Sequence, residues 1–391
     1  MSKLKLLSII IPTKDRYNYL KQLVNYIDSF DTKDIELILQ DNTFNNAEIL
    51  DFLNQKNRTY LKYYHTKAQI PISANVDLSI KNSTGEYVCF IGDDDGVLPN
   101  IIDCVKWMKQ KNIDALSPAI MIYNWPDYLD FDNEGVSAAL LFDGFSFDGK
   151  MRDPLKELQA LADRGFKHLH TIPKVYQGIV KRSCLDEIYK MGGTFTPGPS
   201  PDMATAVALC FVVKKFVTIN VPVIFIGQSH TVGGGERNLK GAVKNIEDVP
   251  FLPPKAKDNW DKRIPKVWCS QTVWPESAIK AIQYMKGQKQ IAINYEFILA
   301  WFIHTHPSQK KLAFRLSQNK IKLIGYLAYY KLGLPTLDLI AKAKFWTNKI
   351  TLIEGRENIV PGINNIEQAG NYLSKHYPNF MQMDAINIRR Y

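Results

Sequence analysis

Short apolar runs and helical patterns alternate through the first 110 residues. The runs at 6–11, 35–40, 60–65 and 86–92 are rich in β-branched or aromatic residues, which is typical of strands. Between them, apolar residues recur at helical spacing. A repeated order of strand and helix with short loops predicts a mostly parallel sheet with helices on both faces. This α/β class matters for function because such sheets bind ligands beyond the carboxyl ends of their strands.

Residues that flank the predicted helices indicate where these helices begin and end. Ser73 is expected to be the N-cap of a helix over 74–83, with Gly85 at its C-terminal end. Ser183 is expected to cap a second helix, which ends in a Gly-Gly pair. Both serines have a hydroxyl that can accept a hydrogen bond from a backbone N–H of the first turn.

Strand signals become rare beyond about residue 240. Residues 251–391 hold 21 Lys and Arg against 9 Asp and Glu, whereas the first 250 residues are almost neutral. We therefore expect an α/β domain over 1–240 and a basic, mainly helical domain over 241–391. A basic surface attracts nucleic acid, anionic lipid or acidic substrates, and composition does not choose among them.

Cysteine usage and hydropathy bear on the compartment. The five cysteines are scattered and form no CxxC pair, which argues against a disulfide framework and against a structural zinc site. No secretory signal is evident, and no apolar stretch reaches the roughly 18 residues of a membrane-spanning helix. We expect a cytoplasmic protein, with peripheral contact at the inner face of the plasma membrane through its basic part.

Three consecutive aspartates, Asp93, Asp94 and Asp95, follow the last strand of the alternating region. Like charges at this spacing repel, so the chain places them together for a solvated turn or for a cation. Adjacent carboxylates suit a hard divalent cation such as Mg²⁺ or Mn²⁺, which shares its oxygen ligands with a substrate phosphate. The three aspartates alone leave both alternatives open.

Four segments resemble glycosyltransferase family 2, the inverting nucleotide-sugar enzymes of GT-A fold. "SIIIPTKDR" (8–16) resembles the first strand and loop of the family, and "LILQDNTFNN" (37–46) resembles its Asp-rich second loop. "NVDLSIKNSTGEYVCFIGDDDGVLPN" (75–100) follows the family's order of Asn, helix, Gly-Glu-Tyr, strand, acidic motif and Pro. "PSPDMATAVAL" (199–209) is similar to the segment that holds the catalytic base. The departures are Gln40, Gly92 and Pro201, where the family often has acidic residues.

The resemblance implies a donor site over the first, second and fourth strands. Asp41 would accept a hydrogen bond from the nucleobase, and Asp93 would bind the ribose. Asp94 would hold a divalent metal, Mn²⁺ or Mg²⁺, and Asp95 would contact the metal or the donor sugar. The nucleotide-binding residues implied in this way are Pro12, Thr13, Arg16, Asp41, Asp93 and Asp95.

Further candidates lie later in the chain. The resemblance implies that Asp202 is the general base, while a plain helix N-cap is its alternative role. His230 and Arg237 stand on either side of a Gly-rich stretch, where they would supply a metal ligand and a phosphate contact. The alternative for that stretch is an ordinary surface loop. His168 and His170 are expected on one face of a strand, in a structural or acceptor-side role.

The activity implied by the resemblance is metal-dependent, inverting sugar transfer from a nucleoside diphosphate, with a UDP-sugar as the expected donor. The acceptor would be a hydroxyl of a surface glycan, such as capsule or O-antigen, or of its polyprenyl-linked precursor. No nucleic-acid motif is present, and a homo-oligomer stays open. One alternative is a nucleotidyltransferase, which would normally need a Gly- and basic-rich loop after the first strand. The other is a non-catalytic module that binds a nucleotide sugar or glycan.

Overall fold

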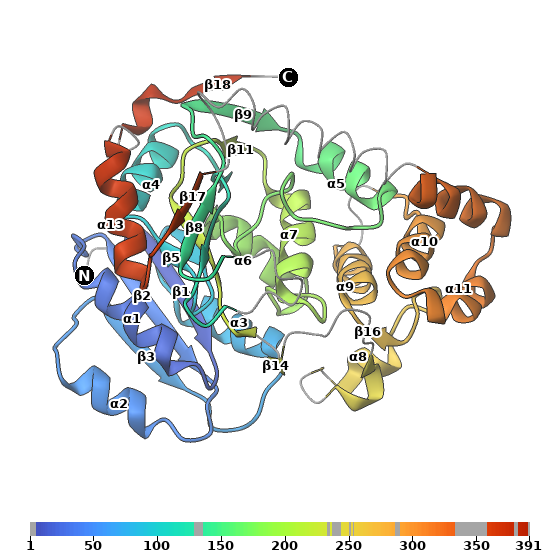
Figure 1. The fold of residues 1–391 in the computed structure, drawn as a ribbon, viewed down its shortest axis with the longest axis horizontal. Helices are drawn as coiled ribbons and strands as arrows, with labels where there is room; N and C mark the ends of the chain where they lie inside the picture. The colour runs from blue at the N-terminus through green and yellow to red at the C-terminus, as the bar shows by residue number, and fades with distance from the viewer. Residues whose placement is uncertain are drawn as a thin grey trace.

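The structure is a computed structural model that describes residues 5–128, 136–232, 235–236, 244–249, 252, 254–285, 290–332, 358–378 and 382–389. A nine-stranded sheet forms its centre (Figure 1). In spatial order the strands are β18 (Asn387–Arg389), β9 (Asp148–Arg152), β11 (Phe216–Ile219), β6 (Ala115–Ser117), β10 (Ile179–Lys181), β4 (Tyr87–Phe90), β1 (Leu7–Thr13), β2 (Ile35–Asp41) and β3 (Leu61–His65).

The predicted parallel arrangement is confirmed for the first part of the chain. Strand β1 pairs in parallel with both β2 and β4, and β2 pairs in parallel with β3. Antiparallel pairs occur where β10 joins β4 and β6, and where β11 joins β9. The fold is therefore α/β with a mostly parallel central sheet. The flanking helices are α1 (Tyr17–Ile27), α2 (Ala47–Asn54), α3 (Ile72–Asn82), α4 (Ile101–Gln110), α5 (Pro154–Asp163), α6 (Arg182–Gly192) and α7 (Pro201–Val212).

A second sheet of five strands lies beside the carboxyl end of β4. Its order is β17 (Asn358–Pro361), β8 (Ala139–Phe142), β7 (Met121–Asn124), β12 (Ile224–Gln228) and β5 (Gly96–Val97). Strand β5 directly follows the aspartates and pairs antiparallel with β12. This pairing brings the end of β12 to the acidic segment. Two short antiparallel pairs lie outside these sheets: β13 (Thr231–Val232) with β14 (Gly235–Glu236), and β15 (Lys244–Asn245) with β16 (Val267–Trp268).

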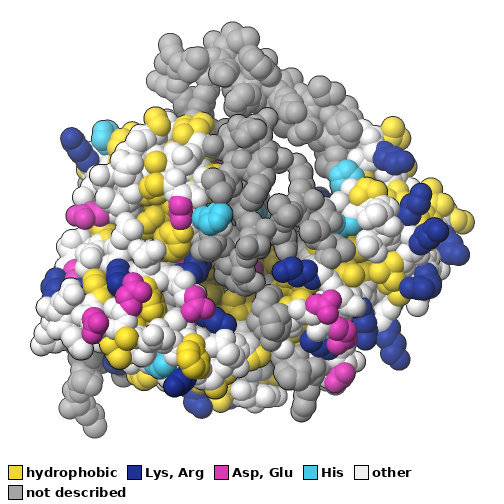
Figure 2. All heavy atoms as spheres, turned by 60° about the horizontal axis from the view of Figure 1, so that its bottom comes forward, with side chains coloured by type: hydrophobic (Ala, Val, Ile, Leu, Met, Phe, Trp, Pro, Cys, Tyr) yellow, Lys and Arg dark blue, Asp and Glu magenta, His cyan; other side chains and the backbone are white. Residues whose placement is uncertain are grey.

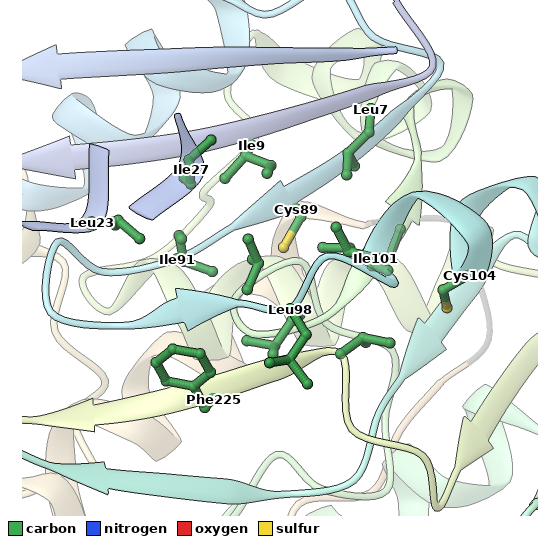
Figure 3. Packing of buried hydrophobic residues seen from close by; sticks show 14 of the residues in the cluster. Leu7, Ile9, Leu23, Ile27, Cys89, Ile91, Leu98, Ile101, Cys104 and Phe225 are labelled. Carbon is green, nitrogen blue, oxygen red and sulfur yellow. The ribbon is translucent and has the colours of Figure 1, made fainter. Parts of the chain in front are cut away.

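The middle of the central sheet is buried on both faces, because β1, β2 and β4 are mostly apolar and nearly every residue of them is buried. Alternate side chains of β1 enter different clusters: Leu7, Ile9 and Ile11 pack on one face and Ile10 on the other. Figure 3 shows the first cluster, where Leu23 and Ile27 of α1 and Ile101 of α4 meet side chains of β1 and β12. The five cysteines are free and buried, as expected for small core residues.

Several predictions of helix ends and strands are wrong. Helix α3 begins at Ile72, after Pro71 in an extended conformation (ψ 150°), so Ser73 lies inside the helix rather than at its N-cap. The helix ends at Asn82, and Gly85 instead packs against Ser8, whose side-chain oxygen would lie 2.5 Å from an added Cβ.

Two more expectations fail after residue 160. Helix α6 follows β10 without a loop, so its N-cap is Lys181 and Ser183 lies in its first turn. Its C-cap is Gly193 in the left-handed conformation (φ 80°), in agreement with the predicted Gly-Gly end. His168 and His170 stack on each other with ring centroids 5.6 Å apart, but they lie in an irregular segment between α5 and β10 rather than in a strand.

The described residues after 250 are mainly helical, as predicted. The helices are α8 (Pro254–Asp258), α9 (Ser270–Tyr284), α10 (Tyr295–Thr305), α11 (Lys310–Leu316), a helical segment over 320–332, and α13 (Ile366–His376). Short 3₁₀ turns are η1 (Ile246–Asp248), η2 (Pro307–Gln309) and η4 (Met383–Ala385). No helix within the described ranges is both long enough and apolar enough to cross a membrane.

The last described residues return to the first part of the chain. Strand β17 pairs with β8, β18 pairs with β9, and α13 packs beside α1 (Figure 1, red beside blue). Ile366, Ala369 and Leu373 of α13 belong to the same core cluster as α1. The division of the chain at residue 240 stays a prediction, but β17 and β18 are built into sheets that residues before 240 form, and α13 packs in their core.

Candidate functional site

The carboxyl ends of β1, β2 and β4 bring the sequence-predicted residues to one edge of the sheet. Thr13 ends β1, Asp41 ends β2, and Asp93 to Asp95 follow β4. All three consecutive aspartates are buried, with exposures of 2%, 8% and 0%. A solvated turn would leave them exposed, so these carboxylates must be stabilised by specific partners within the protein or by a ligand.

Arg16 is the main partner of this acidic segment. Its Nη1 lies 2.8 Å from Asp93 Oδ1, and its Nη2 lies 2.6 Å from Asp94 Oδ2. The same Nη2 donates to Ser229 Oγ at 2.7 Å, and Ser229 in turn donates to Asp94 Oδ2 at 2.7 Å. The guanidinium also lies 5.1 Å from the ring centre of Tyr19. Arg16 therefore links the loop after β1 to the aspartates and to the residue that follows β12.

Asp93 is the aspartate that contacts β1. Thr13 Oγ1 donates to Asp93 Oδ2 at 2.6 Å. Burial raises the pKa of Asp93 to about 7, with the neighbouring charge of Asp94 adding to the effect and Arg16 opposing it. The carboxylate is thus held in an environment where protonation and ionisation compete near neutral pH.

Asp95 is fixed by groups from three parts of the chain. The backbone N–H groups of Gly92 and Gly227 each donate to it at 2.8 Å. Gln177 Nε2 donates to both of its oxygens, at 3.2 and 3.1 Å. Burial and the charge of Asp94 raise the pKa of Asp95 to about 6. At Gly227 an added Cβ would lie 1.7 Å from the Asp94 carbonyl oxygen, so the close approach of β12 needs glycine there.

Asp41 has a different environment. Its Oδ2 accepts hydrogen bonds from the hydroxyls of Tyr17 (2.6 Å) and Tyr63 (2.8 Å), and its Oδ1 accepts from the Thr43 N–H (2.8 Å). The residue is fully buried. Pro12, within β1, is half-buried. Asp41 already has three donors, so a nucleobase would share this carboxylate with the two tyrosines.

Asp202 is the second residue of α7, and Ser200 is the N-cap position of that helix. The Ser200 hydroxyl donates to the Asp202 carboxylate. Burial raises the pKa of Asp202, while Ser200, nearby backbone N–H groups and Lys174 oppose that rise. The plain N-cap alternative is not what the structure has, because Asp202 lies in the first turn rather than at the N-cap.

Lys174 connects the two acidic positions electrostatically. The residue is 7% exposed, and burial lowers its pKa. Asp95 and Asp202 both act on it as attractive charges. Lys174 is therefore within electrostatic reach of both carboxylates.

One of the predicted residues that the structure describes, His230, is not joined to this cluster. His230 follows Ser229 and is exposed. Arg237 lies outside the described residues. Within the described part of the chain, no group of three or more His, Cys, Asp or Glu side chains is arranged to hold a metal ion.

The acidic cluster fits a divalent cation that arrives together with a phosphate ligand. Asp93 to Asp95 supply three carboxylates, against the two nearby cations Arg16 and Lys174, so negative charge is in excess. Burial is the main reason that the pKa of Asp93 is raised, and the neighbouring charge of Asp94 adds to it. Mg²⁺ is typically bound by one or two carboxylates plus substrate phosphates, so a protein-only cage of three ligands is not required.

Three residues of this site were missed by sequence reasoning. Ser229 lies 213 residues from Arg16, Gln177 lies 82 residues from Asp95, and Lys174 lies in an irregular segment. The sequence offered one local signal for Gln177, which is the glycine that follows it, Gly178, because glycine often marks a turn of the backbone. The backbone of Gln177 has φ 55°, in the left-handed region.

Part of the chain is similar to known glycosyltransferases. The family model "Glycosyl transferase family 2" matches residues 8–169. An uncharacterized glycosyltransferase of Rickettsia bellii is 28% identical over 147 residues, which are 37% of this chain and 20% of that protein. Glycosyltransferase GlyG of Streptococcus pneumoniae serotype 4 is 29% identical over 132 residues, which are 33% of this chain and 42% of GlyG. The matched region therefore spans less than half the length of either relative.

Solved structures of S. aureus TarS are more distant. The structure of TarS 1–349 in complex with UDP-GlcNAc aligns over 83% of this chain and 80% of that chain, with 15% identity and a TM-score of 0.46. TarS 1–349 in complex with UDP aligns over 57% of this chain and 60% of that chain, with a TM-score of 0.39.

Proposed function

Because the chain belongs to glycosyltransferase family 2 through residues 8–169, we propose that it transfers a sugar from a nucleoside diphosphate to an acceptor hydroxyl, with inversion. The observation that supports this most directly is the buried acidic segment at the strand ends. Three buried aspartates beside one arginine form a site with an excess of negative charge, which a cation and its phosphate ligand would offset. The expected donor is a UDP-sugar.

Asp94 is the proposed ligand of a divalent metal, Mn²⁺ or Mg²⁺, with Asp95 as a second contact to the metal or the donor sugar. When bound, the metal neutralises the charge that develops on the leaving nucleoside diphosphate. The roles proposed for the protein side chains are binding and orientation. Thr13 and Arg16 hold Asp93, which faces the ribose, and Asp41 accepts a hydrogen bond from the nucleobase. Pro12 lines the base.

Asp202 is the proposed general base. Its carboxylate would take the proton of the acceptor hydroxyl while that oxygen attacks the sugar, and a single displacement inverts the anomeric centre. Burial raises the pKa of Asp202, which makes it a stronger base than an exposed aspartate. The Ser200 hydroxyl, which donates to this carboxylate, fixes its orientation.

The acceptor is proposed to be a surface glycan or its polyprenyl-linked precursor, met at the inner face of the plasma membrane. The excess of lysine and arginine after residue 250 supports peripheral contact with an anionic surface. His230 as an added metal ligand and Arg237 as a phosphate contact belong to the same proposal, since both lie in the segment after β12.

The test combines ligand binding and turnover. Purified protein is screened by thermal shift against nucleoside diphosphates and nucleotide sugars, with and without Mn²⁺, and active pairs are then assayed for release of the diphosphate with an acceptor present. A shift with one diphosphate that requires metal is expected, because a ligand bound to the native state raises its stability. No shift with any diphosphate would contradict the donor site.

Two substitutions separate the proposed base from a structural carboxylate. Asp202→Asn is expected to bind the donor normally and to lose about 10²–10⁴-fold in turnover. Asp28→Asn is the control, since Asp28 is a half-buried carboxylate that pairs with Arg58 and Tyr60 at the end of α1. Full turnover by Asp202→Asn would exclude its role as base. Diphosphate released from a nucleoside triphosphate would favour a nucleotidyltransferase, and binding without turnover would favour a binding module.

A further inference from the structure

A cavity of about 930 Å³ lies apart from the acidic site. It is formed where the segment after α5 meets α10 and the helical segment 320–332. Its lining residues are Arg164, Lys167, His168, Phe297, Lys322, Gly325, Tyr326 and Tyr329. The lining contains three cations and three aromatic rings but no carboxylate. The charge of this lining is opposite to that of the acidic site, so the cavity and the acidic site would bind groups of opposite charge.

The cations of this cavity are not neutralised by the protein. Within the described residues, neither Arg164, Lys167 nor Lys322 forms an ion pair with an acidic side chain. Lys167 Nζ donates to the Tyr330 hydroxyl at 3.0 Å and lies 4.8 Å from the centre of that ring. Burial lowers the pKa of Lys167, which reflects the cost of keeping its charge here without an anion. An anionic ligand would offset that cost.

His168 adds an unused polar group to the same wall. Its Nδ1 is buried and has no hydrogen-bond partner among the described residues. Burial and the charges of Arg164 and Lys167 lower the pKa of His168, so the ring is neutral at physiological pH. A neutral imidazole beside two cations can hydrogen-bond a phosphate group without adding a further unpaired charge.

The helical segment 320–332 also exposes apolar side chains next to the cavity. Ile321 is 85% exposed and Ile324 is 55% exposed. At 3.6 residues per turn, these two isoleucines share a stripe that adjoins the stripe of Lys322, Tyr326 and Tyr329. The opposite side of the helix is anchored by Leu323 and Tyr330, which are buried in a cluster with α10. Figure 2 shows lysine and arginine side chains gathered with hydrophobic ones on the side of the molecule where Figure 1 places α10 and α11.

We propose that this cavity and helix dock the protein on a bilayer that contains anionic phospholipid. A lipid phosphate would occupy the cavity beside Lys167 and Lys322, and Ile321 and Ile324 would enter the boundary between headgroups and acyl chains. This proposal deepens, and rests on, the membrane contact included in the proposed function. A soluble acidic saccharide would explain the cations and rings, but it would leave the two exposed isoleucines without a role.

Vesicle sedimentation with the full chain, in the absence of nucleotide, tests the proposal. The wild-type protein is expected to sediment with phosphatidylcholine vesicles that contain phosphatidylglycerol and not with phosphatidylcholine alone. Lys322→Ala is expected to weaken the partition by about fivefold, the effect of one surface lysine near an anionic membrane. The double variant Ile321→Ser, Ile324→Ser is expected to weaken it by at least about tenfold, since two apolar side chains no longer enter the bilayer. All three residues are exposed, so the variants are expected to fold.

Lys311→Ala is the matched control. Lys311 is an exposed lysine of α11 in the same basic region, but it does not line the cavity. The partition of the Lys311→Ala variant onto the vesicles is expected to stay within about twofold of that of the wild type. An equal loss in Lys311→Ala and Lys322→Ala would overturn the proposal, because it would mean that only overall charge matters.

Three other outcomes also oppose the proposal. Unchanged partition of the isoleucine variant would show that no apolar insertion occurs. Failure of the wild type to sediment would remove the docking surface, and binding of oligogalacturonate without vesicle binding would assign the cavity to a saccharide. Thermal shifts with nucleoside diphosphates on the same samples report the donor site separately, so failure of the membrane contact and failure of sugar transfer are distinguishable.

Discussion

Replacing Arg16 with methionine is expected to destabilise the protein in a way that depends on pH. The substitution keeps much of the side-chain volume but removes the ion pairs to Asp93 and Asp94 and the hydrogen bond to Ser229. The guanidinium is only 11% exposed, so its removal leaves buried carboxylates without their nearest cation. Removing one partner of a buried ion pair costs about 3–5 kcal/mol of stability.

The sign of the pH dependence follows from the pKa of Asp93. In the folded protein that pKa is raised to about 7, above its ordinary value of 3.8, so the native state binds more protons than the unfolded state between these values. The contribution of Asp93 to stability is therefore present at low pH and lost as pH rises through 7. Without Arg16 the pKa of Asp93 rises further, so the loss is largest at alkaline pH. Each further unit of rise corresponds to about 1.4 kcal/mol.

Urea unfolding of wild type and Arg16→Met at about pH 5 and about pH 8 measures both effects. The variant is expected to lose the full 3–5 kcal/mol at the higher pH and clearly less at the lower pH, where protonated carboxyls need no cation. Arg58→Met is the control, because Arg58 is a buried arginine paired with Asp28, whose pKa is lowered. Its loss is expected to be the same at both pH values. Equal losses for Arg16→Met at both pH values would refute the argument.

Three other predictions test packing and electrostatics near the strand ends. The Glu36 carboxylate accepts hydrogen bonds from two hydroxyls, two backbone N–H groups and one lysine, and its pKa is lowered to about 2. The ionised Glu36 carboxylate should contribute roughly 3 kcal/mol to the free energy of unfolding, present above about pH 4.5 and lost as pH falls through about 2. Glu36→Gln should therefore lower the stability at pH 7 and flatten the acid-unfolding curve. An unchanged acid-unfolding curve would contradict this. Gly96→Ala should lower the free energy of unfolding by about 1–3 kcal/mol, because the added Cβ would lie 2.1 Å from the Phe225 ring. Urea unfolding measures this loss, and an unaltered midpoint would show that the ring moves freely. Gln177→Leu removes two hydrogen bonds to Asp95 and should shift the pH dependence of donor affinity to higher pH, measured by titration calorimetry; an identical pH profile would separate Asp95 from donor binding.

The sequence predicted the parts of the fold that depend on local apolar pattern. Strands β1 and β2 begin and end within two residues of the predicted runs, because continuous β-branched segments have few alternatives to burial in a sheet. Local pattern misled where a stronger neighbour acted: Pro71 sets the start of α3 and overrides the capping tendency of Ser73. The five-stranded sheet was not predicted, since β5 has only two residues and no periodicity to detect.

For the candidate site, the sequence indicated the aspartates but not their partners. Asp93 and Asp94 are noticeable because two like charges are adjacent, which can be seen in the sequence without any structure. Their pairing with Arg16 joins residues about 80 positions apart, and Ser229 enters only because β12 pairs with β5. Such contacts depend on tertiary topology, so a single sequence with no homologues does not specify them.

The return of the chain after residue 358 has a practical consequence for dissecting the protein. Gly370 of α13 fits so closely against Tyr26 of α1 that an added Cβ would lie 1.8 Å from the tyrosine hydroxyl oxygen. Removing everything after residue 240 would uncover Tyr26 at this contact and leave β8 and β9 each with one neighbouring strand instead of two. The helices between 254 and 332 are also part of the core, because Val273, Ala278 and Ile279 of α9 lie in the same cluster as the apolar side chains of α7. A shorter folded variant therefore has to keep α9 and α10 as well as α13 and the last strands, because their removal would expose the apolar side chains of α7.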